Sequence, residues 1–255
     1  MAEAEVTELF DEHEIAARVG DLARMAVDRL PGDFVVAREE LARACGLPLS
    51  RVRIVVEATG GGFGSKLTLG PYALAAVELS RKAGAPVRLV LDRHEEQTDA
   101  GYRPPTWQRL RIGARRDGPL CAISLLSYGS AGVALGAGVG NVASRLYECA
   151  NYEEAHYDVL INTGPGCAMR APGAVPGAFA LEQAIDELAE KLGMDPITLR
   201  DMIDPSPARR EERRIGAERI GWSRRHAPGT EPGPIKTGLG TAQSLWGANV
   251  RLNSA

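Results

Sequence analysis

Several patterns that mark common functional sites are missing from this sequence. It has four cysteines and four histidines in 255 residues, and no two cysteines are spaced as CxxC. A disulfide framework, a zinc site and an iron–sulfur cluster are therefore not expected. The histidines show no HxH or HxxxH spacing, so we interpret each as structural or superficial. The residues are Cys45, Cys121, Cys149, Cys167, His13, His94, His156 and His226.

Strong charge and long apolar runs are missing as well. The net charge is −3, which gives no electrostatic case for binding nucleic acid. No stretch reaches the roughly 18 apolar residues that span a bilayer, and residues 1–10 are acidic and unlike a secretion signal. With the cysteine pattern, this predicts a cytoplasmic protein without a membrane span. The alternating charges of residues 209–214 predict a solvated helix face.

The sequence does contain clear helix signals. Residues 177–192 give the strongest, because Leu181, Ile185 and Leu188 line one apolar face and Gly193 follows as a C-cap. Asp195 as N-cap and a proline at the first helical position predict the next helix. Apolar residues at helical spacing predict the others. Helices are expected at residues 1–30, 36–45, 71–83, 177–192, 196–202 and 208–220.

Strand signals alternate with these helices. The β-branched segments 51–57 and 87–91 flank the helix at 71–83, and the whole predicts a βαβ-like crossover. Asp117-Gly118 is a hairpin signal between two longer predicted strands. A linker is expected at residues 228–234. Strands are expected at residues 51–57, 87–91, 106–114, 120–130, 155–162 and from 237 onward.

A glycine-rich loop at residues 59–66, TGGGFGSK, is the first candidate site. Glycines let the backbone approach a ligand closely, and successive N–H groups can bind an anion or a polar ring. Lys66 can add a positive charge. The loop matches neither the Walker spacing nor the GxGxxG dinucleotide pattern. A phosphate- or nucleotide-binding module and a purely structural turn therefore remain as alternatives.

A second candidate lies at residues 169–179, MRAPGAVPGAF. Its prolines restrict the loop, and the helix that follows has unsatisfied N–H groups at its start. Arg170 can therefore be held in a fixed position, where its guanidinium can bind a phosphate or carbonyl oxygen. An arginine in an ordinary surface turn is the alternative.

Taken together, these loops and their surroundings resemble the molybdenum-binding subunit of the xanthine dehydrogenase and aldehyde oxidase family. The resemblance covers roughly three quarters of the chain, in the family's order and with its separations. The passages that carry it are REELARACGLP (38–48), RVRIVVEATGGGFGSK (51–66), QTDAGYRPPTWQRLRIGARRDG (97–118), MRAPGAVPGAFALEQAIDELAEKLGMDPITLRDM (169–202) and GAERIGWSRR (216–225).

The resemblance implies which residues contact the cofactor. In the family the glycine-phenylalanine loop lies beside the molybdenum centre and its backbone contacts the pterin. The family's loop arginine near the metal falls on Arg170. The resemblance implies no protein ligand of the metal, which is held by the cofactor's sulfurs. The implied cofactor-binding residues are Gly61, Gly62, Phe63, Gly64, Arg170 and Ala171.

The family resemblance also implies an activity and partners. The reaction is oxidative hydroxylation of a small-molecule substrate, an aldehyde or an N-heteroaromatic, with oxygen taken from water. The implied cofactor is the molybdenum-pterin cytosine dinucleotide. Iron–sulfur clusters and FAD carry the electrons onward, on an iron–sulfur subunit and a flavin subunit. The downstream part of the large subunit is a further implied partner.

The sequence departs from the family at informative positions. The family's Thr-Gln pair should fall near Pro31 and Gly32, where neither residue is present. Purine-oxidising members carry a glutamate where this chain has Leu67, so purines are not expected as substrates. The family's general base lies far downstream of Ala255, so no catalytic residue is assigned here.

These observations predict a mixed α+β fold that resembles the first molybdopterin-binding domain of the large subunits. We expect an unrelated helical segment at residues 1–35, the molybdopterin-binding-like domain at 36–227, and a linker with the start of a further domain at 228–255. An exposed apolar surface is expected where the remaining subunit docks. The main hypothesis is a segment of a molybdenum hydroxylase large subunit. The alternative is a non-catalytic remnant or accessory protein that keeps the fold and binds a partner subunit.

Overall fold

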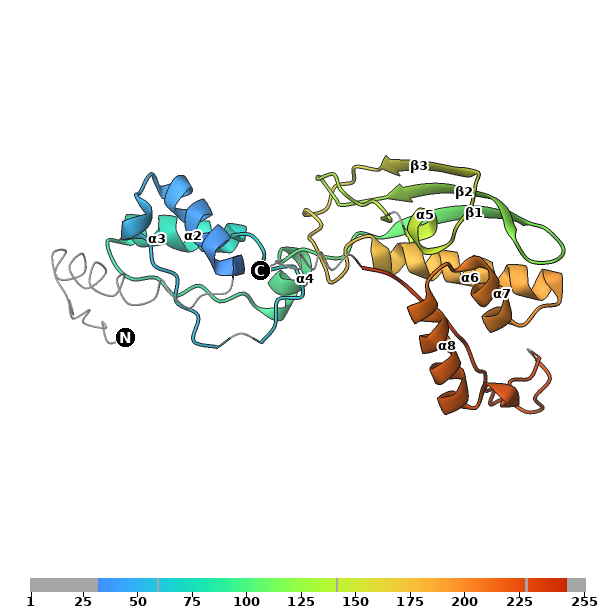
Figure 1. Cartoon of the computed structure of the whole chain (residues 1–255). Helices are drawn as coiled ribbons and strands as arrows, with labels where there is room; N and C mark the ends of the chain where they lie inside the picture. The colour runs from blue at the N-terminus through green and yellow to red at the C-terminus, as the bar shows by residue number, and fades with distance from the viewer. Residues whose placement is uncertain (1–31, 59, 141, 228, 247–255) are drawn as a thin grey trace, which may run out of the picture. The chain divides into compact units, whose positions relative to one another are not determined.

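The computed structural model describes residues 32–58, 60–140, 142–227 and 229–246. The fold is mixed α+β, as predicted (Figure 1). It forms two compact units. Unit 1 contains the described residues up to Tyr102 together with Cys167–Arg170, and unit 2 contains Arg103–Gly166 and the described residues from Ala171 onward.

Unit 2 is built on a three-stranded mixed sheet. Strands β1 (Thr106–Ala114) and β2 (Leu120–Gly129) are antiparallel, and β3 (Tyr152–Asp158) runs parallel to β2. Gly118, with φ of 112°, lies in the turn between β1 and β2, which confirms the predicted hairpin. Half-buried and exposed residues alternate along β1. The sheet therefore turns one face to the core and the other to solvent.

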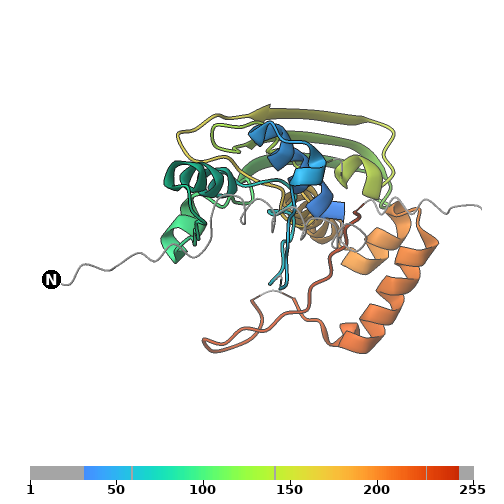
Figure 2. The ribbon, with the colours of Figure 1, turned by 90° about the vertical axis from the view of Figure 1, so that its left-hand side faces the viewer.

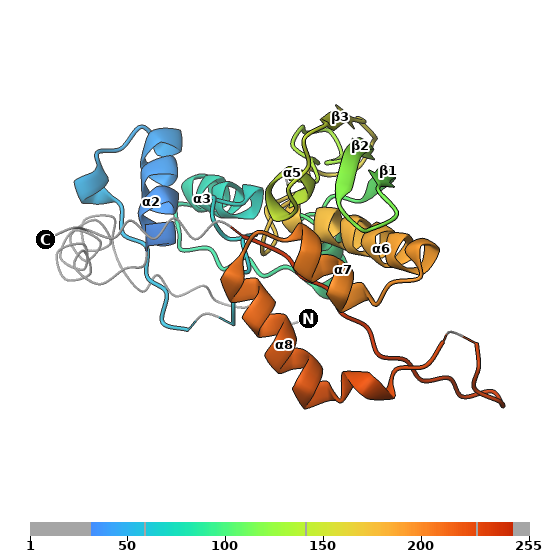
Figure 3. The same cartoon turned by 45° about the vertical axis from the view of Figure 1, so that its right-hand side comes forward.

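Helix α6 (Ala174–Leu192) covers the inner face of the sheet (Figures 1 and 3). Leu181 and Ile185 are fully buried on one side of this helix, as its sequence pattern predicted. They form a core with Ile123 of β2 and with helix α5 (Val142–Leu146). Burial of these apolar side chains is the main term that stabilises unit 2.

Helices α7 (Pro196–Ile203) and α8 (Pro207–Ile220) begin with caps that the local sequence provides. The Asp195 carboxylate accepts hydrogen bonds from the first N–H groups of α7, and Ser206 accepts one from α8. Gly221 ends α8 in the left-handed conformation, and the short 3-10 helix η2 (Trp222–Arg224) follows. Figures 2 and 3 show α8 leading away from the sheet.

Unit 2 also buries a charged network beside its apolar core. The Arg200 guanidinium is fully buried, 2.9 Å from Glu182 and 2.7 Å from Asp186. Tyr147 donates a hydrogen bond to Glu182 at 2.5 Å. Burial and the negative charge of Glu182 raise the pKa of Tyr147. Glu182 and Asp186 thus belong to a packed helix, and their common partner is Arg200.

The charges of residues 209–214 divide between the interior and the surface. Arg209 and Arg213 lie one helical turn apart and both pair with the buried Asp204, at 2.5 and 2.6 Å. Arg214 is exposed and pairs with Glu211 at 2.7 Å. The prediction of a solvated face is therefore correct for Arg214 and wrong for Arg213, because α8 packs one side against the end of α7.

Unit 1 has helices but little core. The Asp92 and Glu95 side chains form a reciprocal capping box at the start of its last helix. In the described part of unit 1, the buried apolar residues are Ala37, Ala42 and Val52. The elements are α2 (Gly32–Cys45), the 3-10 helix η1 (Leu49–Arg51), α3 (Pro71–Ala83) and α4 (Arg93–Thr98).

The predicted βαβ-like crossover is wrong. Helix α3 has the predicted bounds, but residues 52–57 and 87–91 form no strand with any described part of the chain. Their β-branched residues favour extended backbone, yet a strand also needs a hydrogen-bonded neighbour. The glycine loop does not lead directly into a helix either, because α3 starts at Pro71 with Gly70 as its N-cap.

Other differences are smaller. Strand β3 starts and ends earlier than the predicted 155–162, and helices α4 and α5 were not predicted. Residues 237–246 are irregular where a strand was expected. The predicted helix at 1–30 lies outside the described residues. Among the helices that are described, none is both long and apolar enough to cross a membrane.

Candidate functional site

The glycine loop of unit 1 has a strained backbone. Gly61 and Gly64 adopt φ of 108° and 109°, and Phe63 adopts φ of 53°, a conformation that costs energy for a residue with a Cβ. The Ser65 N–H and hydroxyl both donate to the Gly62 carbonyl, at 3.0 and 2.9 Å. These bonds hold the loop as a tight turn, and the Phe63 side chain is 62% exposed.

The second loop contacts this turn inside unit 1. The Arg170 N–H donates to the Phe63 carbonyl at 2.5 Å. A Cβ at Gly64 would lie 2.7 Å from the Ala168 carbonyl oxygen, so only glycine allows this approach. The structure therefore brings together five of the six predicted cofactor-binding residues. Ala171 belongs to unit 2, where it packs against the apolar core.

The segment Cys167–Arg170 is also fixed at its other end. The Cys167 N–H donates to the Tyr102 carbonyl at 3.0 Å. A Cβ at Gly101 would lie 2.6 Å from the Cys167 sulfur, so this glycine makes room for the thiol. Burial raises the pKa of Cys167, which keeps the thiol protonated and less reactive. Sequence reasoning missed the role of Gly101, although it stands in one of the passages that carry the family resemblance.

The geometry leaves backbone donors available in the glycine loop. The N–H groups of Gly61, Gly62, Phe63 and Gly64 donate to no acceptor in the described part of the chain. Successive N–H groups in such turns form concave anion-binding sites. Three of these four residues are glycines without a Cβ atom, and Phe63 has a positive φ, so the backbone allows the close approach that a flat ring or a phosphate needs. The residues present therefore fit a pterin cofactor with a phosphate group.

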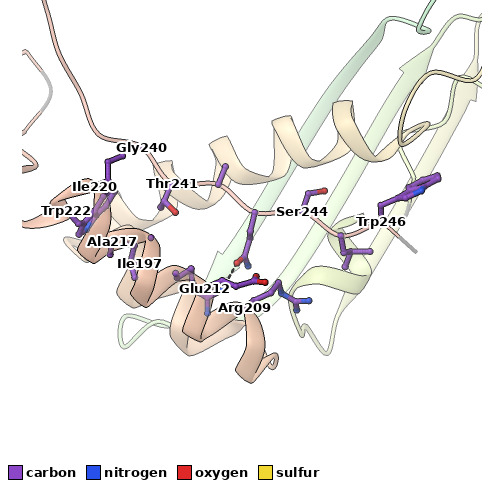
Figure 4. Close-up of a pocket in the computed structure, with 15 residues that line it drawn as sticks. Ile197, Arg209, Glu212, Ala217, Ile220, Trp222, Gly240, Thr241, Ser244 and Trp246 are labelled. Atoms are coloured by element: carbon purple, nitrogen blue, oxygen red, sulfur yellow. Dashed lines mark hydrogen bonds between the residues drawn. The ribbon is translucent and has the colours of Figure 1, made fainter. Parts of the chain in front are cut away.

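Unit 2 contains a separate groove, of about 630 Å³, between α8 and residues 240–246 (Figure 4). Gln243 fixes this stretch of chain. Its N–H donates to Glu182 at 2.8 Å, and its side chain accepts from Arg213 at 2.5 Å and donates to Asp204 at 3.0 Å. The two arginines that line the groove, Arg209 and Arg213, are already paired with Asp204, so the groove offers little to bind an anionic ligand.

His156 is a half-buried histidine of β3. Its Nδ1 lies 2.8 Å from the Ser127 hydroxyl, and its Nε2 lies 3.5 Å from Asp158. Asp158 in turn accepts hydrogen bonds from the N–H groups of Gly136 and Ala137. Ser127 is fully buried, so its hydroxyl is not accessible to a substrate. The arrangement holds the loop of Gly136 and Ala137 against the sheet. No cluster of three metal-ligating side chains occurs among the described residues.

Comparisons with known proteins identify the family. A family described as the molybdopterin cofactor-binding domain matches residues 33–203. The aldehyde oxidoreductase molybdenum-binding subunit PaoC of Escherichia coli O157:H7 is 39% identical over an alignment of 217 residues that covers 79% of this chain and 29% of that protein. The chain thus spans less than a third of the length of this curated relative.

Comparison with solved structures supports the same family. Quinoline 2-oxidoreductase from Pseudomonas putida 86 matches with a TM-score of 0.63 and 29% identity, over 69% of this chain and 23% of that one. The aldehyde oxidoreductase from Desulfovibrio gigas matches with a TM-score of 0.58 and 30% identity, over 67% of this chain and 19% of that one. The chain belongs to the molybdopterin cofactor-binding domain family, with the molybdenum-binding subunits of aldehyde oxidoreductases and xanthine dehydrogenases.

Proposed function

We propose that this chain is the part of a molybdenum hydroxylase large subunit that supplies two of its cofactor-binding loops. The observation that carries the proposal is the hydrogen bond from Arg170 to Phe63, at 2.5 Å. It joins two loops that are more than a hundred residues apart in the sequence. Strain at Phe63 and the close approach at Gly64 are kept only where the surrounding structure enforces them, as at binding sites.

In this proposal the backbone does most of the binding. The N–H groups of Gly61 to Gly64 donate to polar atoms of the pterin, and the Arg170 guanidinium offers planar charged donors nearby. Ala171 completes the turn that carries Arg170. When bound, the molybdenum-pterin cofactor supplies the two-electron oxidation, and we propose its cytosine dinucleotide form. The protein's part is to orient the cofactor and to keep the loops rigid.

The proposed reaction is oxidative hydroxylation of an aldehyde or an N-heteroaromatic with water as the oxygen source. Two relatives support this substrate range, because one is a subunit of an aldehyde oxidoreductase and the other is a quinoline oxidoreductase. Leu67 follows the loop lysine where a glutamate would favour purines, so purines are not proposed. The general base and the remaining cofactor contacts would come from the downstream part of the large subunit. Iron–sulfur and flavin subunits would accept the electrons.

The first experiment measures molybdenum and pterin per chain after expression in a host that makes the cytosine dinucleotide cofactor. The chain is expressed alone and together with the downstream part of a related large subunit. Stoichiometric molybdenum in either sample supports the proposal if it is lost in Arg170→Ala and Gly64→Val. Arg43→Ala and Gly60→Ala are the matched controls, because Arg43 is an exposed helix residue and a Cβ at Gly60 meets nothing within 4 Å.

The alternative is a non-catalytic remnant or accessory protein. The specific observation in its favour is the sequence near Pro31 and Gly32, where the family's Thr-Gln pair is missing. A folded chain that binds neither molybdenum nor pterin, even with the downstream part present, would contradict the main proposal. Association with that part in the absence of any cofactor would then support the alternative.

A further inference from the structure

Unit 1 contains a small apolar groove away from the two loops just described. It lies between α2, the chain that follows η1, and α3, and its volume is about 340 Å³. Small-molecule sites typically have volumes of about 300–1,000 Å³. The groove is therefore large enough for a small ligand and too small for a protein segment with its side chains. It is lined by Leu41, Cys45, Leu47, Arg51, Val52, Arg53, Val55 and Val77.

The walls of this groove are held in place by hydrogen bonds. The Arg38 guanidinium of α2 donates to the carbonyl oxygens of Val52 and Leu49, at 2.8 and 2.5 Å. Arg81 of α3 donates to the Cys45 carbonyl at the end of α2, at 3.1 Å. These hydrogen bonds connect α2, α3 and the chain after η1, which form the three walls of the groove. The groove is thus formed before any ligand binds, which lowers the entropy cost of binding.

Arg53 is the unusual member of the lining. Its Nε and Nη1 are shielded from water and have no hydrogen-bond acceptor among the described residues. Burying charged donors without a partner is costly, so most buried polar groups in proteins are paired. A second arginine, Arg51, also lines the groove, and the described lining contains no acidic side chain. The groove therefore combines apolar walls with a positive charge that no side chain in the described part of the chain neutralises.

We propose that this groove binds a small amphipathic monocarboxylate. The carboxylate pairs with the guanidinium of Arg53, whose planar donors match two carboxylate oxygens. The aliphatic or aromatic body of the ligand lies against Leu41, Val55 and Val77. A polyphosphate would leave charged oxygens against these apolar walls, and a neutral ligand would leave Arg53 unpaired. The inference is independent of the proposed molybdenum cofactor.

The test uses the full chain and octanoate as the probe. Titration calorimetry gives the dissociation constant, and alkylation of Cys45 reports occupancy of the groove, with the exposed Cys121 as an internal reference. Octanoate should slow alkylation of Cys45 and leave Cys121 unchanged. Arg53→Gln should weaken octanoate binding by about tenfold or more, because a charge-assisted hydrogen bond is lost. Arg43→Gln removes an exposed charge from α2 outside the groove and should change binding by less than about twofold.

Two further ligands separate charge from apolar contact. Acetate should bind far more weakly than octanoate, because it lacks the apolar body, and octylamine should not compete, because its charge has the wrong sign. The proposal is overturned if octanoate leaves Cys45 unprotected, if acetate binds as tightly as octanoate, or if Arg53→Gln binds as well as the parent chain. Molybdenum content is measured on the same variants, so loss of this site and loss of the cofactor site are distinguished.

Discussion

The two units of this chain differ in how they are stabilised. Unit 2 has a sheet, a covering helix with fully buried Leu181 and Ile185, and buried ion pairs around Arg200. Unit 1 has helices without a comparable core, and α3 and α4 have no buried residue at all. The predicted cofactor-binding residues lie almost entirely in unit 1. The binding loops are therefore carried by the part of the chain with the least apolar burial.

This difference indicates which surfaces await a partner. Apolar side chains are exposed on each unit, among them Val56 and Phe63 in unit 1 and Phe179 of α6 in unit 2, which is 68% exposed. Exposed apolar patches commonly mark interaction sites. The sequence predicted such a surface for the docking of the remaining subunit. We propose that the downstream part of the large subunit covers it and supplies the stability that unit 1 lacks.

The largest expected loss of stability comes from breaking the buried charged network of unit 2. Arg200→Ala leaves the Glu182 carboxylate buried without its cationic partner, which should lower the free energy of unfolding by about 3–5 kcal/mol. Chemical denaturation followed by circular dichroism measures the loss. Arg214→Ala, which breaks an exposed pair with Glu211, is the control and should cost less than about 1 kcal/mol. Equal losses in the two variants would mean that the buried network is not a main support of unit 2.

The next largest loss of stability is expected for a core leucine of unit 2, compared with a partly exposed leucine of unit 1. Leu181→Ala in α6 leaves a cavity in the core of unit 2 and should cost about 2–5 kcal/mol. Leu79→Ala in α3 removes a side chain that is 48% exposed, and should cost less than about 1 kcal/mol. Denaturation of both variants checks the difference. A large loss for Leu79→Ala would show that α3 is packed against something in solution, for example a second copy of the chain.

A third prediction concerns the contact between the two loops. Gly64→Ala places a Cβ against the Ala168 carbonyl and requires a positive φ, so it should cost about 1–3 kcal/mol. Hydrogen exchange, measured by mass spectrometry, should show faster exchange for the Arg170 N–H, which loses its Phe63 acceptor. Gly60→Ala meets nothing within 4 Å and should leave this exchange unchanged. Unchanged exchange in Gly64→Ala would argue that the loops do not touch in solution.

The smallest effect is a pH dependence in unit 2. Burial alone would raise the pKa of Asp204, but hydrogen bonds from Arg209, Ser206, Arg213 and Gln243 outweigh it and hold this pKa below its usual range. The ionised carboxylate therefore stabilises the fold above its unfolded pKa of about 3.9, and this stability is lost as the pH falls below that value. Asp204→Asn should destabilise the chain at neutral pH and bring it closer to the parent chain in acid.

Denaturation at a series of pH values measures this effect. The difference in unfolding free energy between the parent chain and Asp204→Asn should shrink as the pH falls below about 4. A difference that stays constant with pH would show that the Asp204 carboxylate keeps an ordinary pKa.

The sequence by itself determined the features that depend on near neighbours. Helix α3 has the predicted bounds, and the bounds of α6, α7 and α8 lie close to those predicted, because prolines, Asp195, Gly193 and Gly221 start and stop them through contacts within a few residues. The hairpin at Gly118 was predictable for the same reason. The family resemblance, which drew on motif order along the chain, also named the glycine loop and the arginine loop.

Only the tertiary structure decided which distant segments meet. Residues 52–57 have the composition of a strand but form none here, because a strand exists only when another backbone pairs with it. The alternating charges of α8 did not reveal that Arg213 is buried against Asp204, since that depends on the packing of α8 against the end of α7. In the same way, the hydrogen bond from Arg170 to Phe63 joins loops that no local sequence rule connects.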